Sequence, residues 1–241
     1  MNAKKIRLDQ ALSLRRKLSR SQAENFIKLG LVKVNNQIVT KPSSLTNSND
    51  KIDILEQETY VSRAGLKLAS VADIFELDFN SSIVLDVGSS TGGFTDYALK
   101  HGAKKVIAID VGTEQLHPKL RGNPKIDLRE KTDIRSVSKL DDRVNFVLID
   151  VSFISIREIL DHLPKLIDKK TLVVAMVKPQ FEAGQSALKH KGVIKNSSIR
   201  RDILQDFERW VKSRYKILSK QDSGVAGQKG NLEKFYLLKL I

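Results

Sequence analysis

The sequence predicts an α/β protein, in which a mostly parallel sheet with helices on both faces follows a small α+β domain. Three observations support this class. Short apolar runs alternate with helical patterns in the later part of the chain, the last two apolar runs follow each other without a helix, and the early part is strongly basic. The 241 residues have room for one medium and one small domain. We therefore expect a boundary near residues 58–62, between domains 1–60 and 61–241.

The first domain is expected to hold two helices and a small sheet. Apolar residues at helical spacing from Leu8 predict the first helix. The segment SRSQAENFIKLG predicts the second, which would begin at a capping box of Ser21 and Glu24 and stop at Gly30. LVKVNNQIV then predicts a hairpin around Asn35-Asn36, since asparagine tolerates the left-handed conformation of a tight turn. A last short strand is expected over 51–55.

Basic residues crowd this domain, and few acids precede Asp50. A lysine-rich solvated surface is one interpretation of the pattern. We favour a helix–turn–helix face that follows a phosphate backbone, because such surfaces hold the phosphates with lysine and arginine. The candidate RNA-binding residues are Arg7, Arg15, Arg16, Lys17, Arg20, Lys28, Lys33 and Lys41.

The formal net charge of +14 favours a polyanionic partner, RNA or DNA, over a membrane, because no basic amphipathic helix with exposed aromatic residues is evident. No stretch approaches the ~20 apolar residues that span a bilayer. The N-terminal lysines are not followed by an apolar segment, so a signal peptide is not expected. The chain has no cysteine, which excludes disulfides and fits a reducing cytoplasm. Its four histidines are scattered, and we predict no metal site.

The second domain alternates strands and helices, which predicts a parallel sheet that is covered on both faces. The expected strands are 82–87, 105–110, 144–150 and 171–177, and helical patterns fill the gaps, for example over 94–101 and 155–167. The chain ends differently, because RYKILSKQDS and NLEKFYLLKLI are two strand-like runs joined by a glycine-rich stretch. We expect them to pair as an antiparallel hairpin at one side of the sheet.

A glycine-rich loop, VLDVGSSTGGF, follows the first strand of this sheet, at the edge where ligands bind in open α/β folds. Its glycines read G-x-x-x-G-G instead of the G-x-G-x-x-G of dinucleotide sites. Asp86 before the loop would repel a pyrophosphate and attract an amino group, and Asp110 after the next strand suits ribose hydroxyls. A structural turn is the alternative. The two acids around the loop favour S-adenosylmethionine, which carries cationic sulfonium and ammonium groups.

The loop and its flanks supply the candidate cofactor-binding residues. Glycines let the backbone approach a ligand closely, and the following helix offers free N–H groups. Asp133 in KTDIR is a further candidate, which would meet the adenine amino group. The full set is Asp86, Gly88, Ser89, Ser90, Thr91, Gly92, Gly93, Phe94, Asp110 and Asp133.

A resemblance extends the interpretation of the first domain. IRLDQALSLRRKLSRSQAENFIKLGLVKVNNQIVTKPSSL is similar to the S-four (alpha-L) RNA-binding module, which occurs in a small-subunit ribosomal protein and in RNA-modifying enzymes. The match runs through Leu8-Asp9, the segment 19–23, Gly30, Val32, Val34-Asn35 and Lys41. This resemblance implies structured RNA as the partner, recognised by shape as much as by sequence.

The second domain resembles the FtsJ-like RNA 2′-O-methyltransferases, and within them the TlyA type, which is often labelled haemolysin. The motifs are YVSRAGLKL, DVGSSTGGFTD, DVSFIS, VKPQFEAG, KGVIKN and KGNLEKF. Ala64 and Asn36 stand where many relatives have glycine, a departure that touches only local backbone geometry. The resemblance implies a Rossmann-like methyltransferase sheet, S-adenosylmethionine as cofactor, and ribose 2′-O-methylation of ribosomal RNA, alone or in ribosomal subunits, at cytidine. It leaves the target nucleotide, the subunit and the oligomeric state open.

The same resemblance implies a Lys-Asp-Lys-Glu catalytic tetrad, matched here by Lys67, Asp150, Lys178 and Glu233. A ribose hydroxyl is a poor nucleophile, so a nearby group must accept its proton. Lys178 ends the apolar run TLVVAMVK and is our candidate base, which requires a pKa depressed by burial and by Lys67 as a second cation. Alternatively, Lys178 acts by charge and positioning while water carries the proton away. Each residue alone would be an ordinary surface or capping residue, so the prediction depends on the set.

Two phenylalanines and one basic segment carry further expectations. Phe153 and Phe181 are expected in the core or a pocket wall and not as base-stacking platforms, and the basic segment ALKHKGVIKN is expected to contact RNA.

Rival functions are a ribosome-assembly factor without catalysis, a haemolysin and an NAD-dependent dehydrogenase. The tetrad argues against the first, the absence of a membrane-spanning pattern against the second, and the glycine spacing against the third.

Overall fold

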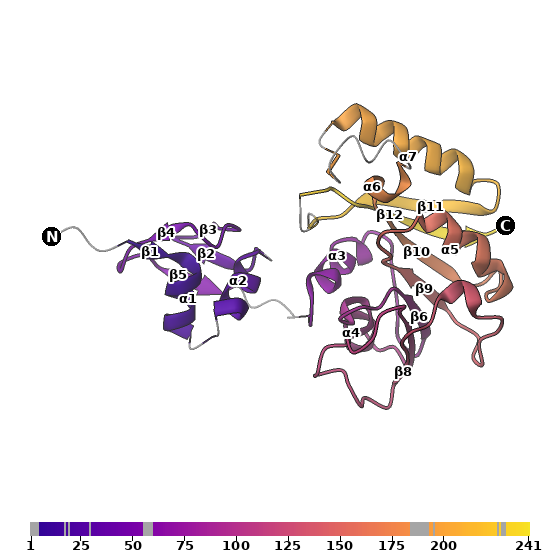
Figure 1. Ribbon diagram of the computed structural model, residues 1–241, viewed down its shortest axis with the longest axis horizontal. Coiled ribbons are helices and arrows are strands. Elements are labelled where there is room, and N and C mark those ends of the chain that lie inside the picture. Colours follow the sequence, from indigo (N-terminus) through magenta and orange to yellow (C-terminus); the bar gives the residue numbers. More distant parts are fainter. Residues whose placement is uncertain are drawn as a thin grey trace. The chain divides into compact units, whose positions relative to one another are not determined.

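The computed structural model describes residues 5–16, 18, 20–28, 30–54, 60–183, 193–194, 196–225, 227 and 230–241, except for the side chains of residues 21, 22, 25 and 28. The chain divides into two units, Met1–Thr59 and Tyr60–Ile241 (Figure 1). Each unit has its own apolar core.

The first unit packs two helices against small antiparallel sheets. Its elements are β1 (Ile6–Arg7), α1 (Leu8–Arg16), α2 (Arg20–Lys28), β2 (Val32–Val34), β3 (Gln37–Ile38), β4 (Leu45–Thr46) and β5 (Ile52–Ile54). One sheet has the order β3-β2-β5, and β1 pairs with β4. Side chains from both helices meet Val32 and Ile52 in the core. The unit therefore has the two helices and the small sheet that the sequence predicts.

Two details of this unit follow from local backbone chemistry. Asn35 and Asn36 both have positive φ, 49° and 68°, and form the two-residue turn between β2 and β3, as the asparagine pair predicts. The expected capping box is wrong, because α2 begins at Arg20 and Ser21 therefore lies inside its first turn. Gly30, with φ +72°, follows the end of the helix in the left-handed conformation that ends many helices.

The second unit is built on one seven-stranded sheet with the order β11-β12-β10-β9-β6-β7-β8. Its strands are β6 (Ile83–Val87), β7 (Lys105–Ile109), β8 (Ile126–Arg129), β9 (Phe146–Ile149), β10 (Leu172–Val177), β11 (Tyr215–Asp222) and β12 (Lys234–Leu240). The five strands from β10 to β8 are parallel, and β12 is antiparallel to both β10 and β11. The C-terminal antiparallel hairpin is therefore confirmed.

Helices cover both faces of this sheet (Figure 1). On one face, α3 (Arg63–Ala72) and α4 (Gly93–Lys100) pack on Val84, Val106 and Val174. On the other, α5 (Ile156–His162) and α7 (Ser197–Val211) pack on the alternate residues of the same strands. Because the strands are buried on both sides, they appear in the sequence as continuous apolar runs.

Two connections differ from the predicted helix pattern. Residues 110–125, between β7 and β8, form no α-helix, since the segment VGTEQLHPKLRGNP contains two prolines and two glycines. The helix expected over 155–167 stops at His162 and continues as the short 3₁₀-helix η2 (Leu163–Lys165). Pro164 lacks the N–H that would bond the carbonyl of Leu160, and the Tyr215 hydroxyl donates to that carbonyl instead, at 2.8 Å.

Strand order creates a switch point between β6 and β9. The chain proceeds from β6 through β7 to β8. It then passes through the short 3₁₀-helix η1 (Ile134–Ser136) and returns to β9 on the other side of β6. The loops after β6 and β9 therefore diverge, and a crevice opens beyond their carboxyl ends. Residues 88–92 follow β6, and Asp150 follows β9.

Candidate functional site

The loop after β6 depends on its glycines. Gly88 and Gly92 have φ of +81° and +86°, a conformation that strongly favours glycine. A Cβ on Gly88 would lie 2.7 Å from the carbonyl oxygen of Asp150. Only glycine therefore lets the loop close against the end of β9, which brings the predicted cofactor loop next to a predicted catalytic acid.

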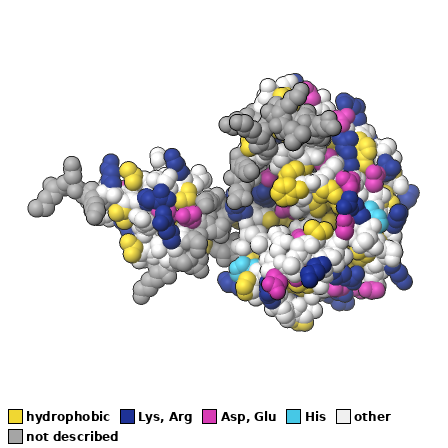
Figure 2. Space-filling model, viewed as in Figure 1, with side chains coloured by type: hydrophobic (Ala, Val, Ile, Leu, Met, Phe, Trp, Pro, Cys, Tyr) yellow, Lys and Arg dark blue, Asp and Glu magenta, His cyan; other side chains and the backbone are white. Residues whose placement is uncertain are grey.

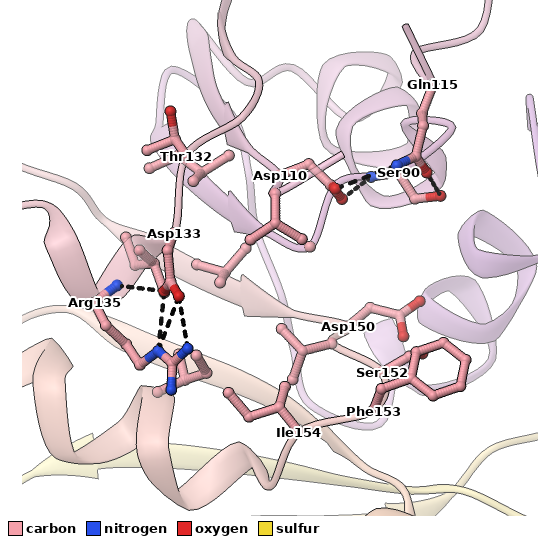
Figure 3. Close-up of a pocket in the computed structure, with 17 residues that line it drawn as sticks. Ser90, Asp110, Gln115, Thr132, Asp133, Arg135, Asp150, Ser152, Phe153 and Ile154 are labelled. Atoms are coloured by element: carbon pink, nitrogen blue, oxygen red, sulfur yellow. Dashed lines mark hydrogen bonds and ion pairs between the residues drawn. The ribbon is translucent and has the colours of Figure 1, made fainter. Parts of the chain in front are cut away.

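Asp110, at the end of β7, holds this loop in shape. Its Oδ2 accepts a hydrogen bond from the backbone N–H of Ser90 at 2.8 Å, and its Oδ1 accepts one from the N–H of Gly112 at 2.7 Å. The Ser90 hydroxyl in turn donates a hydrogen bond to Gln115 Oε1 at 3.1 Å (Figure 3). A carboxylate offers about four acceptor positions, so Asp110 retains capacity for hydroxyl groups of a ligand.

A cavity of about 480 Å³ lies beyond the carboxyl ends of β6, β7 and β9. Much of its wall is aliphatic, and three acids open into it (Figure 3). A volume of this size, with a few convergent polar groups, suits a small molecule with one flat apolar part. The wall includes Val87, Ile109, Val111, Ile134, Val151, Ile154 and the acids Asp110, Asp133 and Asp150.

Asp133 lines the far end of this cavity, opposite Asp110 (Figure 3). Its carboxylate accepts from the backbone N–H of Arg135 at 2.9 Å and from Nη2 of the same residue at 2.6 Å. The Arg135 guanidinium lowers the pKa of Asp133 from its ordinary value. Arg135 also pairs with Glu158. Asp133 is therefore held as a carboxylate, with its orientation set by Arg135.

Asp86 lies on the α4 side of β6 and is completely buried. Its Oδ2 accepts a 2.6 Å hydrogen bond from the Thr95 hydroxyl on α4, whereas its Oδ1 has no hydrogen-bond partner among the described residues. Burial raises the pKa of Asp86 to about 7, and the charges of Asp150 and Asp110 add to the shift. Asp86 opens into a cavity of about 150 Å³ that Ser89, Thr91 and Lys178 also line.

The four residues of the predicted tetrad line one further cavity, of about 610 Å³. They come from distant parts of the chain: Lys67 from α3, Asp150 after β9, Lys178 after β10 and Glu233 just before β12. The structure thus brings together all four at the switch-point side of the sheet. This cavity shares Ser90, Asp150, Ser152 and Phe153 with the 480 Å³ cavity, so the two are neighbours.

Two ion pairs organise the tetrad. Lys178 Nζ lies 2.6 Å from Asp150 Oδ1, and Lys67 Nζ lies 2.9 Å from Glu233 Oε1. The second pair is nearly inaccessible, with 10% and 4% of the two side chains exposed. The sequence predicted that Lys67 would act on Lys178 as a second cation, opposed by Asp150 and Glu233, which could orient the two lysines. In the structure each lysine faces one of these carboxylates, which balances the charge within each pair.

Buried oxygen atoms without hydrogen-bond partners concentrate around these cavities. In the described part of the chain they are Ser62 Oγ, Asp86 Oδ1, Ser89 Oγ, Asp150 Oδ1, Gln180 Oε1 and Glu233 Oε2, of which Asp150 Oδ1 has the ion pair with Lys178. Each belongs to a residue that lines the 610 Å³ or the 150 Å³ cavity. Unsatisfied buried polar atoms are rare in folded proteins, so this cluster indicates that a ligand completes the site.

Sequence reasoning missed Ser152, whose hydroxyl accepts a 2.7 Å hydrogen bond from Lys178 Nζ. It lies two residues after Asp150 in the motif DVSFIS, and this spacing was the available signal. Ser62, Gln180 and Asn231 also line the tetrad cavity and were not predicted. They are ordinary polar residues whose proximity depends on how three separate segments meet.

Phe153 was expected either in the core or in a pocket wall, and the structure places it in a pocket wall. It lines both large cavities, yet 93% of the residue is exposed. Its φ of +67° is unusual for a bulky side chain, and its ring centroid lies 5.3 Å from that of Phe181. Figure 3 shows it beside Ser152 at the edge of the cavity. Strained backbone of this kind is concentrated at functional sites.

The predicted RNA-binding residues of the first unit have partly internal contacts. Arg7 and Arg20 pair with the buried Asp9 at 2.7 and 3.1 Å, and the Arg7 guanidinium is the main reason that the pKa of Asp9 falls to about 2. Arg15 donates to the carbonyls of Asn47, Ser48 and Asp50, and Arg16 to that of Ile52. Figure 2 shows basic side chains gathered beside an acidic one on this unit.

The remaining members of this set divide into two groups. Lys33 is half-buried and Lys41 is exposed. Lys17 and the side chain of Lys28 lie outside the described residues, as does most of the basic segment ALKHKGVIKN. The internal contacts of the four arginines order their side chains on the surface, and Arg15, Arg16 and Arg20 remain exposed.

The sheet order, the glycine loop after β6 and the acids after β7, β8 and β9 together define a Rossmann-like methyltransferase domain. The chain belongs to the FtsJ-like methyltransferase family, whose model matches residues 60–240, and an S4 domain matches residues 6–52. Among the described residues, no helix combines the length and the apolar character needed to cross a bilayer.

Related proteins cover most of the chain. The 16S/23S rRNA (cytidine-2′-O)-methyltransferase TlyA of Mycobacterium tuberculosis is 32% identical over 98% of this chain and 91% of its own length. The 23S rRNA (cytidine-2′-O)-methyltransferase TlyA of Campylobacter jejuni is 39% identical over 77% and 73%. A solved structure of a Streptococcus thermophilus protein, assigned as a hemolysin, is 34% identical, with a TM-score of 0.73 over 98% of this chain and 88% of that chain.

Proposed function

We propose that the protein transfers a methyl group from S-adenosylmethionine to the 2′-hydroxyl of a cytidine in ribosomal RNA. The observation that carries this proposal is the pairing of Lys67 with Glu233 and of Lys178 with Asp150 in a cavity that adjoins a nucleoside-sized one. The names of the TlyA relatives support the choice of substrate and of position on the ribose.

The residues of the smaller cavities fit S-adenosylmethionine. Asp86 offers a buried carboxylate oxygen without a partner among the described residues, which suits a cationic amino group. Asp110 suits the ribose hydroxyls, Asp133 the adenine amino group, and the aliphatic wall the adenine ring. The loop residues Gly88, Ser89, Ser90, Thr91, Gly92, Gly93 and Phe94 complete the set that would hold the cofactor. When bound, S-adenosylmethionine supplies an electrophilic methyl group on a sulfonium.

The tetrad would orient the acceptor and manage one proton. Lys178 donates to Ser152 and faces Asp150 at 2.6 Å, contacts that fix the position of its Nζ in the cavity. As a neutral amine, Lys178 would accept the proton of the 2′-hydroxyl while the ribose oxygen attacks; as an ammonium, it would orient the hydroxyl while water carries the proton away. Lys67 and Glu233 also line this cavity, and Glu233 Oε2, which has no hydrogen-bond partner among the described residues, can accept a hydrogen bond from the RNA. Alignment of this kind supplies a large share of the rate enhancement in group-transfer enzymes.

The S4 domain would deliver the RNA. The matched S4 domain, together with the net charge of +14, supports structured RNA as the partner. We therefore propose ribosomal RNA, alone or in ribosomal subunits, as the substrate and the cytoplasm as the location of the reaction.

The test is mass-spectrometric mapping of ribose methylation in ribosomal RNA from cells with and without this protein. We expect at least one 2′-O-methylcytidine that depends on the protein, and transfer of labelled methyl groups from S-adenosylmethionine to isolated ribosomal subunits. Identical methylation maps, together with no transfer to either subunit, would refute the proposal. RNA binding without S-adenosylmethionine binding in calorimetry would instead favour a non-catalytic assembly factor.

A further inference from the structure

Glu182 is a buried carboxylate that the tetrad does not use. It ends α6 (Pro179–Glu182), four residues after Lys178, and only 1% of its side chain is exposed. Its Oε1 accepts from the backbone N–H of Ile156 at 2.8 Å, and its Oε2 accepts from the Ser155 hydroxyl at 2.7 Å. Both donors lie at the start of α5, immediately after the loop that carries Asp150.

The loop after β9 is thereby attached to the segment after β10 at two points. At the near end, Asp150 and Ser152 contact Lys178 Nζ at 2.6 and 2.7 Å. At the far end, Ser155 and Ile156 bond Glu182. The two segments 150–156 and 178–182 are therefore held side by side by side-chain contacts at both of their ends.

Phe153 lies between the two attachment points. Its strained backbone is the reason that the loop needs the second attachment, at Glu182. Its backbone is in the left-handed region, at φ +67°, and its side chain is almost fully in solvent. Burial therefore does little to offset this strain, apart from the contact with Phe181 on the facing segment. Without a fixed far end, the loop could relax toward ordinary backbone angles and carry Ser152 away from Lys178.

A carboxylate suits this position better than an amide. Each of its two oxygens accepts a bond from a different donor, whereas glutamine has one acceptor oxygen. Arg157 lies 3.4 Å from Oε2 and supplies a positive charge, although it also pairs with Asp206 on α7 at 2.7 Å. Burial raises the pKa of Glu182, and the bonds from Ser155 and Ile156 act in the opposite direction. A buried ion pair adds little net stability, so its presence favours a role in fixing geometry.

We propose that Glu182 is a positioning residue for methyl transfer: it fastens the loop 150–156 to the segment 178–182, so that Asp150 and Ser152 stay on Lys178 and Phe153 stays at the cavity edge. The catalytic part of this inference rests on the proposed function. The attachment of the loop does not depend on that function and can be measured without any substrate.

The experiment compares Glu182→Gln, Glu182→Ala and Ser155→Ala with the wild type. Asp206→Asn is the matched control, because it removes the other partner of Arg157 at an exposed position away from the loop. Hydrogen exchange is followed by mass spectrometry in peptides that cover 151–157, with β10 as an internal reference. Methyl transfer to ribosomal subunits is measured as kcat and KM, and S-adenosylmethionine binding by calorimetry.

We expect faster exchange in 151–157 for Glu182→Ala, with the exchange of β10 unchanged. The kcat should fall about 100-fold in Glu182→Ala and about 10-fold in Glu182→Gln and Ser155→Ala, because small misplacements of catalytic groups have effects of this size. The KM and the cofactor Kd should stay within about twofold, and Asp206→Asn should resemble the wild type.

Wild-type exchange in 151–157 of Glu182→Gln and Ser155→Ala would overturn the attachment. Faster exchange with a wild-type kcat would overturn the positioning role, as would a loss of kcat that only follows the loss of folded protein. If the wild type transfers no methyl group at all, the proposed function fails, and the exchange data still decide whether Glu182 fastens the loop.

Discussion

The two sides of the site are built in different ways. On the proposed cofactor side, the acids are held by residues at most 20 positions away. Asp86 is held by Thr95, nine residues away, Asp133 by Arg135, two residues away, and Asp110 by Ser90, 20 residues away. On the acceptor side, Lys67 and Glu233 are separated by 166 residues. The first side therefore forms with a few local elements, whereas the second exists only once the whole sheet has closed.

The two sides also differ in charge. Asp86 is hydrogen-bonded by Thr95, a neutral residue, and Asp110 is bonded by backbone N–H groups and an amide. Asp133 pairs with Arg135. Lys67 and Lys178, by contrast, each face a carboxylate. Asp86 and Asp110 therefore carry no paired cation among the described residues, whereas the charges of the tetrad are balanced within its two pairs.

The largest effect on the rate of methyl transfer is expected from the tetrad, Lys67, Asp150, Lys178 and Glu233. Replacing Lys178 by alanine should lower the rate of methyl transfer by at least about 10³-fold, since a positioned proton acceptor contributes about 10²–10⁴-fold. The Kd for S-adenosylmethionine should change less than about threefold, because the cofactor-side acids remain. Calorimetry and single-turnover transfer measure the two quantities. Lys239→Ala, at an exposed position of β12, is the control; undiminished transfer by Lys178→Ala would contradict its assigned role.

A smaller, pH-dependent effect is expected on the cofactor side. The pKa of Asp86 is raised to about 7, so below that pH the carboxyl is mostly neutral and attracts a cationic amino group poorly. Cofactor affinity should therefore increase about eightfold between pH 6 and pH 7.5, in proportion to the ionised fraction. Asp86→Asn should bind weakly and without this slope. A flat profile in the wild type would show that Asp86 does not meet the cation.

The same shift affects the stability of the protein without cofactor. The folded state holds the Asp86 proton up to about pH 7, whereas the unfolded chain releases it near the ordinary pKa of 3.8. Over this window the folded state binds more protons, so the contribution of Asp86 to the free energy of unfolding decreases as the pH rises. Urea unfolding at several pH values should show a steeper decrease for the wild type than for Asp86→Asn.

The smallest effect concerns Phe153, which both cavities share. Because its φ is +67° and 93% of the residue is exposed, Phe153→Asn should raise the free energy of unfolding by about 1 kcal/mol, since asparagine tolerates this conformation. Methyl transfer should fall nonetheless. Urea unfolding is the measurement, and Ile74→Asn, at another exposed apolar position, should bring no gain. Destabilisation by Phe153→Asn would mean that the ring contributes packing.

The fold was largely predictable from the sequence, for reasons visible in particular residues. The apolar runs are continuous because the strands are buried on both faces, and Asn35-Asn36 forms a turn that local chemistry prefers. The missing helix between β7 and β8 and the end of α5 before Pro164 were also signalled locally, by prolines and glycines. Ser152 had only one local signal, its place two residues after Asp150. Glu182 was not predictable as a site residue, because its partners Ser155 and Ile156 follow a different strand, β9.

What the sequence by itself determined is the α/β class, the C-terminal hairpin, the glycine loop after β6 and the family, all of which depend on short-range spacing. Only the tertiary structure decided which charges meet. It paired each lysine of the tetrad with an acid, turned Arg7 and Arg20 toward the buried Asp9, and placed Phe153 in solvent at the cavity edge. The physical reason is that hydrophobic patterns and turns act over a few residues, whereas ion pairs depend on distances that the folded sheet creates.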